Sequence, residues 1–288
     1  MIPQTMLAAR FPGDDQIEII ETAVPQPGPG EALLLTRFCG LCGSDRRLYH
    51  RGTAITPGHE LTATVVQNGP GATLPEGARV VVYIKRFCGA CRQCRAGMTN
   101  RCAEAKGGLV GWQTPGGYAQ YLTAPAANCI PLPDDIGDDE GVLLLDTIGT
   151  AAHGIHYALA ASDAHTRSQR AAIVGVGPLG LGSQLILSAL GWAEIGVYDP
   201  NAARVAVATE WGATALDLED STLQDSFGLV IEASGQPAAR ELAMRLVESG
   251  GAVLMLGEND NPWTLTPSPQ IRRKEAAYVR TFYFPLSG

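Results

Sequence analysis

The sequence has no run of about 18 consecutive apolar residues, so no segment of it predicts a membrane-spanning helix. Positive charge is also scarce, because 21 Lys and Arg residues stand against 29 Asp and Glu residues, a net charge of −8. An acidic chain does not attract nucleic acid or an anionic membrane, so neither is expected as a partner. Residues 1–6 lack the basic start and apolar run of a secretory signal, and we expect a cytoplasmic protein.

Internal repeats and low-complexity segments are absent as well. What the chain does have is 45% hydrophobic residues with 17% charged ones, which is typical of a globular protein with real cores. Its 288 residues leave room for one large domain or two ordinary ones.

The first part of the chain is rich in short β-prone runs separated by Pro- and Gly-containing loops. Many short strands at close spacing predict an irregular all-β barrel over the first 130 residues. The predicted strands are residues 16–20, 31–38, 61–67, 79–84 and 118–124.

After residues 131–134 the pattern changes to strands that alternate with helices. Strands are predicted at 171–174, 194–198, 213–216, 229–232, 252–256 and 276–282, and helices at 149–161, 181–190, 202–211 and 238–247. This alternation predicts a parallel sheet with helices on both faces. We therefore expect two domains, 1–147 and 148–288.

Cys42 and His59 are the first candidates for a metal site. Cys42 is followed closely by Asp45, and His59 directly by Glu60, so these four residues offer a thiol, an imidazole and two carboxylates. Such donors hold zinc while leaving one coordination position open. In the alternative interpretation Cys42 is a small buried hydrophobe and His59 a turn residue.

A second cluster has the spacing Cys88-x2-Cys91-x2-Cys94-x7-Cys102. Four thiolates on one folded-back loop match a closed, four-coordinate structural zinc site. An iron–sulfur loop competes with this interpretation, but the bacterial ferredoxin motif has a three-residue last gap and a following proline, whereas Ala103 follows here. Since four protein ligands leave no open position, this zinc would hold a lobe in place.

A glycine-rich turn, Gly-x-Gly-x-x-Gly, follows the predicted strand 171–174 and opens a helix. Asp199 lies at the end of the next predicted strand. A strand, a glycine-rich turn, a helix and then an acidic residue at this position are typical of a dinucleotide-binding site. Asp199 would accept hydrogen bonds from ribose hydroxyls and repel a 2′-phosphate, which favours NAD, although Arg204 keeps NADP open. In the alternative interpretation Asp199 caps the helix that starts after Pro200. The turn residues expected to line the cofactor are Gly175, Gly177, Pro178, Leu179 and Gly180.

With these motifs in this order, the chain resembles the zinc-dependent alcohol and polyol dehydrogenases of the medium-chain dehydrogenase/reductase superfamily. The resemblance runs from residue 8 to residue 284. It implies an N-terminal GroES-like irregular β-barrel followed by a Rossmann doubly wound parallel sheet. The segments that carry it are residues 39–45, 58–60, 88–102, 175–180 and 232–235.

The resemblance also implies roles for individual residues near the first metal. Cys42 and His59 would hold a catalytic zinc, and Asp146 stands where the family has its third protein ligand. Of Glu60 and Asp45, one would approach the metal and the other would orient His59. Two zinc ions per chain are expected, one catalytic and one structural.

Other residues match family positions or depart from them. Ser44 would pass the alcohol proton outward, and Thr150 would pack against the nicotinamide, while Cys39 is not expected to be a ligand. Arg47 occupies the position at which many relatives have a relay histidine, and arginine cannot act as a base near neutral pH. The proton would then leave through cofactor hydroxyls and water, or through His50.

Relatives continue for several dozen residues past the point at which this sequence stops. We therefore expect that the C-terminal tail, which in the family closes part of the cleft, is missing from this sequence.

The leading hypothesis is a zinc-dependent, NAD-linked dehydrogenase that acts on a secondary alcohol, polyol or sugar hydroxyl. The alternative is a truncated, catalytically impaired nucleotide-binding homologue that keeps only the structural zinc. A zinc-free quinone reductase of the same superfamily would not need Cys42 and His59. The resemblance implies a homodimer or homotetramer.

The identity of the substrate cannot be read from residues such as Tyr49, Phe87 and Trp112, which are expected to line its pocket. His153 and His156 lie three residues apart and are interpreted as packed or solvated, not as a metal pair.

Overall fold

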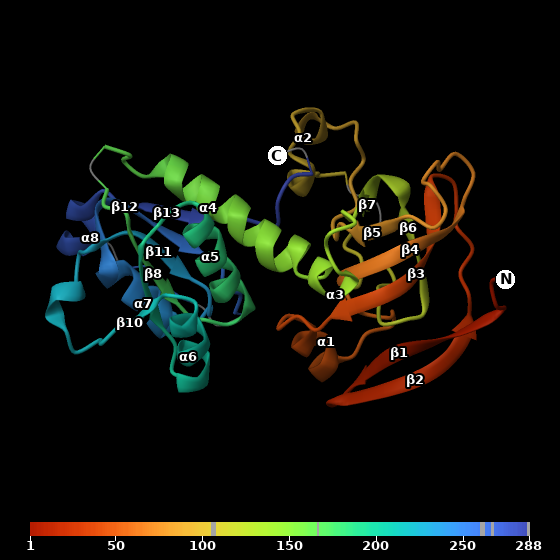
Figure 1. Cartoon of the computed structure of the whole chain (residues 1–288), viewed down its shortest axis with the longest axis horizontal. Coiled ribbons are helices and arrows are strands. Elements are labelled where there is room, and N and C mark those ends of the chain that lie inside the picture. The colour runs from red at the N-terminus through yellow and green to blue at the C-terminus, as the bar shows by residue number, and fades with distance from the viewer. Residues whose placement is uncertain (105–107, 166, 260–262, 266–267, 287–288) are drawn as a thin grey trace. The chain divides into compact units, whose positions relative to one another are not determined.

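The computed structural model describes the chain except for residues 105–107, 166, 260–262, 266–267 and 287–288 (Figure 1). The chain divides into two compact units. The first contains Met1–Leu145 together with Pro285 and Leu286, and the second is Asp146–Phe284. None of the described helices is long and apolar enough to cross a bilayer.

The first unit is built from antiparallel strands. A two-stranded sheet pairs β1 (Thr5–Gly13) with β2 (Gln16–Ala23). The main sheet has the order β6-β3-β4-β5-β7. Its strands are β3 (Glu31–Gly40), β4 (Glu60–Asn68), β5 (Arg79–Val82), β6 (Tyr121–Pro125) and β7 (Cys129–Pro131).

Helical segments in this unit are short and lie in the connections. They are α1 (Asp45–Arg51), α2 (Arg92–Arg95), η1 (Thr99–Arg101), η2 (Ala126–Asn128) and α3 (Asp138–Gly141). Alternate residues of the strands form one buried cluster, because successive side chains of a strand point to opposite faces. Leu34, Leu61, Val82 and Leu122 are all at most 1% exposed within it.

The second unit contains a parallel sheet of order β10-β9-β8-β11-β12-β13. In chain order this is 3-2-1-4-5-6, the doubly wound arrangement that the alternating pattern predicts. The strands are β8 (Arg170–Val174), β9 (Glu194–Tyr198), β10 (Thr214–Ala215), β11 (Phe227–Glu232), β12 (Val247–Met255) and β13 (Ala277–Arg280).

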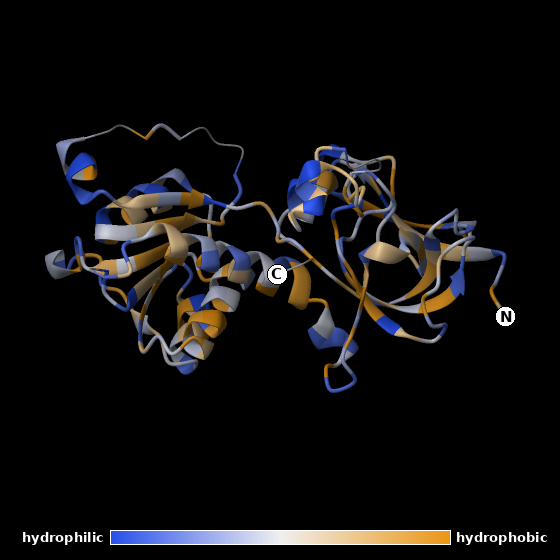
Figure 2. Cartoon of the chain, turned by 90° about the horizontal axis from the view of Figure 1, so that it is seen from above, coloured by the Kyte–Doolittle hydropathy of each residue, from blue (hydrophilic) through white to orange (hydrophobic). Residues whose placement is uncertain are grey.

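Helices cover both faces of that sheet. They are α4 (Thr150–Ala161), α5 (Pro178–Ala189), α6 (Ala202–Glu210), η4 (Ser221–Leu223), α7 (Pro237–Leu246) and α8 (Pro269–Lys274). Ile173 packs into the cluster that contains residues of α4, α5 and α6, whereas its neighbour Val174 packs with α7. Both faces of the strands are therefore buried, and Figure 2 shows the apolar colour along them.

Several elements differ from the sequence-based prediction. The strand β1 was not predicted, since Arg10 and Pro12 interrupt its apolar alternation. The short strand β7 and the helix α8 were also not predicted. The strand β12 begins at Val247, before residues 248–251, which read as a turn because they contain two glycines. The register of the β11–β12 pairing shifts between Phe227 and Leu229 of β11. This shift accommodates the extra residues of β12 at 248–251.

Candidate functional site

The pairing of β3 with β4 determines where the first metal candidates lie. Gly40 at the end of β3 pairs with Glu60 at the start of β4. Cys42 follows the end of β3 and His59 precedes the start of β4, so the two side chains come from neighbouring strand ends. Antiparallel pairing thus brings together residues 17 positions apart in the sequence.

One possible ligand atom from each of Cys42, His59, Glu60 and Asp146 lies within 4.8 Å of the other three. His59 is 2% exposed and Glu60 is 6% exposed. Asp146 directly follows Leu145, the last residue of the first unit's main segment. A thiolate, an imidazole and carboxylates at this separation fit the donor set of a zinc site. Cys39 is not in either metal-ligand group found among the described residues.

The carboxylate of Asp45 lies behind His59. Its Oδ1 is 3.3 Å from His59 Nδ1, and both side chains are almost fully buried. Its Oδ2 accepts hydrogen bonds from the Cys42 backbone N–H at 3.1 Å and from the Tyr118 hydroxyl at 2.7 Å. With Nδ1 turned towards Asp45, Nε2 is the ring nitrogen left for a metal. The two carboxylates differ in position, because Glu60 is in the group of converging ligand atoms whereas Asp45 faces the His59 ring.

Two glycines make this close packing possible. A Cβ at Gly58 would lie 2.8 Å from both Cys39 Sγ and Tyr118 N, and Gly58 has φ +98°, a conformation that favours glycine. A Cβ at Gly40 would lie 2.8 Å from Glu60 Oε2. Burial and the nearby carboxylates raise the pKa of the Cys39 thiol above its ordinary range, so that group is a neutral packing residue.

Three further predicted residues have defined contacts. Ser44 donates a hydrogen bond to Cys42 Sγ at 3.2 Å. The guanidinium of Arg47 lies 5.1 Å from the centre of the Trp112 ring, and that ring lies 6.1 Å from the His59 ring. Thr150 donates to Asp146 Oδ1 at 3.2 Å, just after the π-helical turn Leu144–Gly149. Turns of this kind are frequent at functional sites.

The four-cysteine loop forms a second compact group. The ligand atoms of Cys88, Cys91, Cys94 and Cys102 all lie within 4.8 Å of one another, and all four are free thiols. Sγ atoms are 3.9 Å apart in the pairs Cys88–Cys94 and Cys91–Cys102. Tetrahedral zinc with bonds of about 2.3 Å separates its sulfur ligands by about 3.8 Å, so the loop fits that ion.

Backbone N–H groups of the loop point at its sulfur atoms. Cys91 N donates to Cys88 Sγ at 3.2 Å, and Cys94 N donates to Cys91 Sγ at 3.5 Å. The donation from Cys94 lowers the pKa of Cys91 to about 6. Desolvation raises the pKa of Cys94 to about 12, so a cation would be needed to hold it as a thiolate.

The glycine-rich turn connects β8 to α5. A Cβ at Gly180 would lie 2.1 Å from Gly175 O, so the helix could not approach the strand with any larger residue. A Cβ at Gly177 would meet no atom within 4 Å, which leaves open space beside the backbone there. Pro178 is the first residue of α5 and Leu179 the second. The turn therefore fits a pyrophosphate at a helix N-terminus.

Asp199 lies beside this turn, at the end of β9. Its Oδ2 accepts from Val176 N at 3.0 Å and its Oδ1 accepts from Asn201 N at 2.9 Å. Asn201, not Asp199, is the N-cap of α6. Because a carboxylate offers about four acceptor sites, both oxygens can still accept from a hydroxyl. Arg204 Nη1 is 3.7 Å from Asp199 Oδ2.

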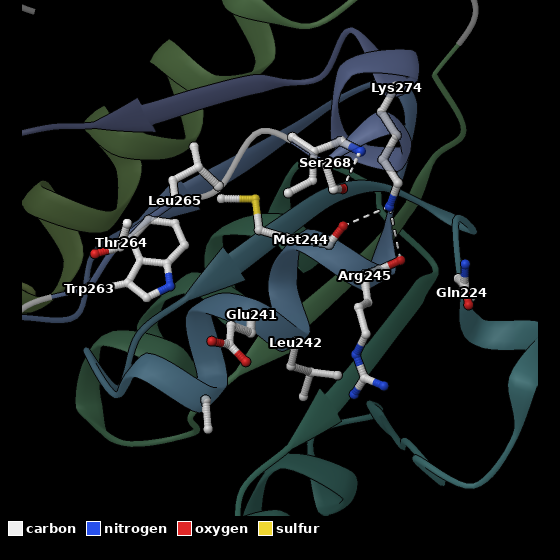
Figure 3. Close-up of a pocket in the computed structure, with 12 residues that line it drawn as sticks. Gln224, Glu241, Leu242, Met244, Arg245, Trp263, Thr264, Leu265, Ser268 and Lys274 are labelled. Atoms are coloured by element: carbon white, nitrogen blue, oxygen red, sulfur yellow. Dashed lines mark hydrogen bonds between the residues drawn. The ribbon is translucent and has the colours of Figure 1, made fainter.

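A cavity of about 580 Å³ on the second unit involves none of the predicted site residues (Figure 3). It is lined by α7, α8 and the segment around Trp263. Lys274 beside it is 6% exposed and donates to the backbone oxygens of Met244, Arg245 and Val247. These bonds give Lys274 a structural role at the C-terminal end of α7.

The remaining candidates lie elsewhere in the two units. Tyr49 contacts Phe11 and His50, and Phe87 contacts Tyr83. His153 and His156 both contact the Tyr157 ring, and neither is in either metal-ligand group of the described chain.

Tyr118 is the site residue that sequence reasoning missed. It lies 73 positions from Asp45, and only the fold brings its hydroxyl to that carboxylate. The Gly116-Gly117 pair before it was the available signal, because a Cβ at Gly116 would lie 2.1 Å from Gly58 O and one at Gly117 would lie 3.0 Å from Cys39 Sγ. Such close approaches mark a segment that packs against the metal-ligand loop.

Comparison with known proteins gives consistent matches. Residues 28–134 match the alcohol dehydrogenase GroES-like domain. The chain is 32% identical over 279 residues to an uncharacterised zinc-type alcohol dehydrogenase-like protein of Escherichia coli K12, covering 88% of this chain and 78% of that protein. It is 31% identical over 258 residues to the L-threonine 3-dehydrogenase of Mesorhizobium japonicum, covering 82% of this chain and 72% of that enzyme.

A solved structure shows the same two-unit fold. A protein of Sinorhizobium meliloti described as a zinc-binding dehydrogenase, crystallised with NADP, superposes with a TM-score of 0.86 at 25% identity. The superposition covers 99% of this chain and 86% of that one.

Proposed function

The chain belongs to the zinc-dependent alcohol dehydrogenases of the medium-chain dehydrogenase/reductase superfamily, and from that premise we propose that it transfers hydride between NAD and a secondary alcohol, polyol or sugar hydroxyl. The observation that carries the proposal is the group formed by Cys42, His59, Glu60 and Asp146, whose ligand atoms lie within 4.8 Å of one another. The buried Asp45 carboxylate behind His59 supports it, since metal-bound histidines commonly have such a partner.

Two metal sites are proposed per chain. Cys42 and His59, with Asp146 or Glu60, would hold the catalytic ion, and the four-cysteine loop would hold the structural one. Zinc, when bound, would act as a Lewis acid and lower the pKa of a hydroxyl held beside it. The structural site offers four sulfur ligands and no open position, so its role would be to stabilise the loop.

The chain's own groups would then hold and move the substrate proton. In the oxidative direction the nicotinamide, when bound, would supply the hydride acceptor for the carbinol carbon, and the proton of the hydroxyl would pass to solvent. Ser44 is the proposed first carrier of that proton, because its hydroxyl already lies 3.2 Å from Cys42 Sγ and can accept and donate at once. Arg47 cannot serve as the base, so the route continues through cofactor hydroxyls and water.

For the cofactor we propose NAD. The side chain of Asp199 is 5% exposed and lies beside the glycine-rich turn, where a ribose hydroxyl could donate to it and a 2′-phosphate would be repelled. The Sinorhizobium meliloti protein was crystallised with NADP. In this chain Arg204 is the only basic residue with a recorded contact to Asp199 in the described structure, and it is 55% exposed, which is weak support for a phosphate.

The proposal is tested by metal analysis together with cofactor reduction. Purified chain should contain two zinc ions and reduce NAD with members of a panel of secondary alcohols, polyols and L-threonine. Cys42→Ala should lose one zinc and the activity. Cys129→Ala is the matched control, because Cys129 is a buried core thiol outside both metal groups, and it should keep both zinc ions.

The competing function is a nucleotide-binding homologue without dehydrogenase chemistry. It predicts one zinc per chain, held by the four-cysteine loop, and NAD binding without reduction by any alcohol of the panel. That outcome would refute the proposed activity. A preference for NADP over NAD with full activity would refute only the proposed cofactor.

A further inference from the structure

Tyr118 is attached to the candidate metal site through Asp45. Its hydroxyl donates to Asp45 Oδ2 at 2.7 Å, and it also lies 2.9 Å from Gly40 O. A phenol has one proton to donate, so the bond to the carboxylate, which is the shorter and the charge-assisted one, is the one that orients it. The same Asp45 oxygen accepts from the Cys42 backbone N–H at 3.1 Å.

Two donors on Oδ2 leave Oδ1 turned towards His59, whose Nδ1 lies 3.3 Å away. The Asp45 side chain is 5% exposed and that of His59 is 1% exposed, so water has little access to replace either donor. The orientation of the imidazole therefore depends on a chain of contacts that runs from Tyr118 to Asp45 to His59.

We propose that Tyr118 is a positioning residue for the metal site, holding the Asp45 carboxylate in the orientation that presents His59 to the catalytic ion. This inference rests on the proposed function, because it assumes a metal between Cys42 and His59. It goes beyond that function by assigning a role to the Tyr118 hydroxyl, which acts through the Asp45 carboxylate.

The position of the Tyr118 ring is secured independently of its hydroxyl. The ring stacks on Phe11 with centroids 5.9 Å apart and an interplanar angle of 26°. Its backbone N–H donates to Pro57 O at 3.0 Å and its carbonyl accepts from Ala9 N at 2.7 Å. Tyr118→Phe should therefore keep the fold and remove only the donor to Asp45.

Tyr121 provides a matched control. It lies on β6, three residues further along, and its ring packs against the small cluster of Met6, Val24 and Leu33. Tyr121→Phe removes a phenolic hydroxyl from the same unit without a contact to Asp45 in the described structure. Asp45→Ala is the reference for complete loss of the carboxylate, because asparagine would still offer an amide oxygen to the Tyr118 hydroxyl.

The experiment measures metal affinity in the whole 288-residue chain, separately from activity. Metal-depleted protein is titrated with Co²⁺ against a competing chelator, and the visible bands of the Cys42 site are followed. Removing an outer partner of a ligating histidine typically costs 10- to 100-fold in metal affinity, and Tyr118 is one bond further out, so we expect about a 10-fold loss in Tyr118→Phe. Affinity at the four-cysteine loop should not change in any variant.

The double variant separates positioning from packing. If Tyr118 acts through Asp45, adding Tyr118→Phe to Asp45→Ala should not lower the metal affinity further, because the carboxylate that Tyr118 holds is already gone. Independent effects that multiply would overturn the inference. So would wild-type affinity and wild-type cobalt bands in Tyr118→Phe, or an equal loss in Tyr121→Phe.

The test also separates this inference from the proposed function. If the wild-type chain binds metal only at the four-cysteine loop, the proposed function fails and the positioning role fails with it. If wild type binds two metals and Tyr118→Phe matches it, only the positioning role is wrong.

Discussion

Two glycines of the same turn should respond to alanine in opposite ways. A Cβ at Gly180 would lie 2.1 Å from Gly175 O, 1.3 Å closer than the 3.4 Å at which ordinary contact begins. The obstacle is backbone at the end of a buried strand, so it cannot rotate away. Overpacking costs about 1–3 kcal/mol, and we expect Gly180→Ala to lose about 3 kcal/mol of unfolding free energy.

Gly177→Ala should keep or slightly raise the free energy of unfolding. A Cβ there would meet no atom within 4 Å, and the backbone has φ −74° and ψ −169°, which any L-residue adopts. Where the conformation is compatible, Gly→Ala stabilises a protein by about 0.4–1 kcal/mol through the unfolded chain. The open space at Gly177 is where we propose that the pyrophosphate lies, so the added methyl group should weaken NAD binding at least 10-fold, or about 1.4 kcal/mol.

Urea unfolding followed by tryptophan fluorescence measures the free energy of unfolding. Calorimetric titration with NAD measures the affinity for the cofactor. The two variants control for each other, because each carries the same chemical change in one turn. The reasoning is refuted if Gly177→Ala binds NAD as wild type does, or if it loses as much stability as Gly180→Ala.

Three further perturbations test other parts of the molecule. Cys91→Ala should lose one zinc per chain and more than about 4 kcal/mol of unfolding free energy, measured by metal analysis and denaturant titration, since loss of a metal belongs to the largest single-residue effects. His50→Ala should leave the pH–rate profile unchanged, because the His50 ring is paired with Asp15 on the β1–β2 turn and is half exposed; a lost ionisation in the profile would establish a relay through it. Lys274→Met should cost about 2–4 kcal/mol of stability without changing KM, because buried backbone oxygens at the end of α7 lose their donor; a raised KM for NAD would contradict a purely structural role.

The parts of the fold that were predicted correctly are those specified by local patterns. The strands β8 and β9 are apolar runs bounded by turn residues, and the glycine-rich turn between them has a fixed spacing. The helix α6 begins directly after an Asn that can cap it. Such signals lie within a few residues of the element they specify, so one sequence suffices to read them.

The missed elements depend on partners far away in the chain. The strand β1 has buried residues at Met6 and Ala8, and its distant partner is the segment before β6, where Ala119 forms a bridge with Ala8 and Tyr118 O accepts a hydrogen bond from Ala9 N. The helix α8 has only six residues, and its last residue, Lys274, is held by three oxygens about thirty positions earlier in the chain. The Tyr118–Asp45 bond is of the same kind, because it exists only once β3, β4 and the segment before β6 have come together.

The donor set of the first site by itself indicates a bound cation. Cys42, Glu60 and Asp146 offer a thiolate and two carboxylates within 4.8 Å, and the Asp45 carboxylate lies directly behind His59. The carboxylates of Asp45 and Glu60, on residues that are 3% and 6% exposed, repel one another and lose hydration, and a positive charge beside them would offset both costs. Arg47 lies over the Trp112 ring at this end of the unit, but the side chain of one arginine does not satisfy four converging donor atoms. A divalent ion does, because it satisfies all of them at one point, and zinc is the ion for which sulfur, imidazole and carboxylate are together the preferred ligands.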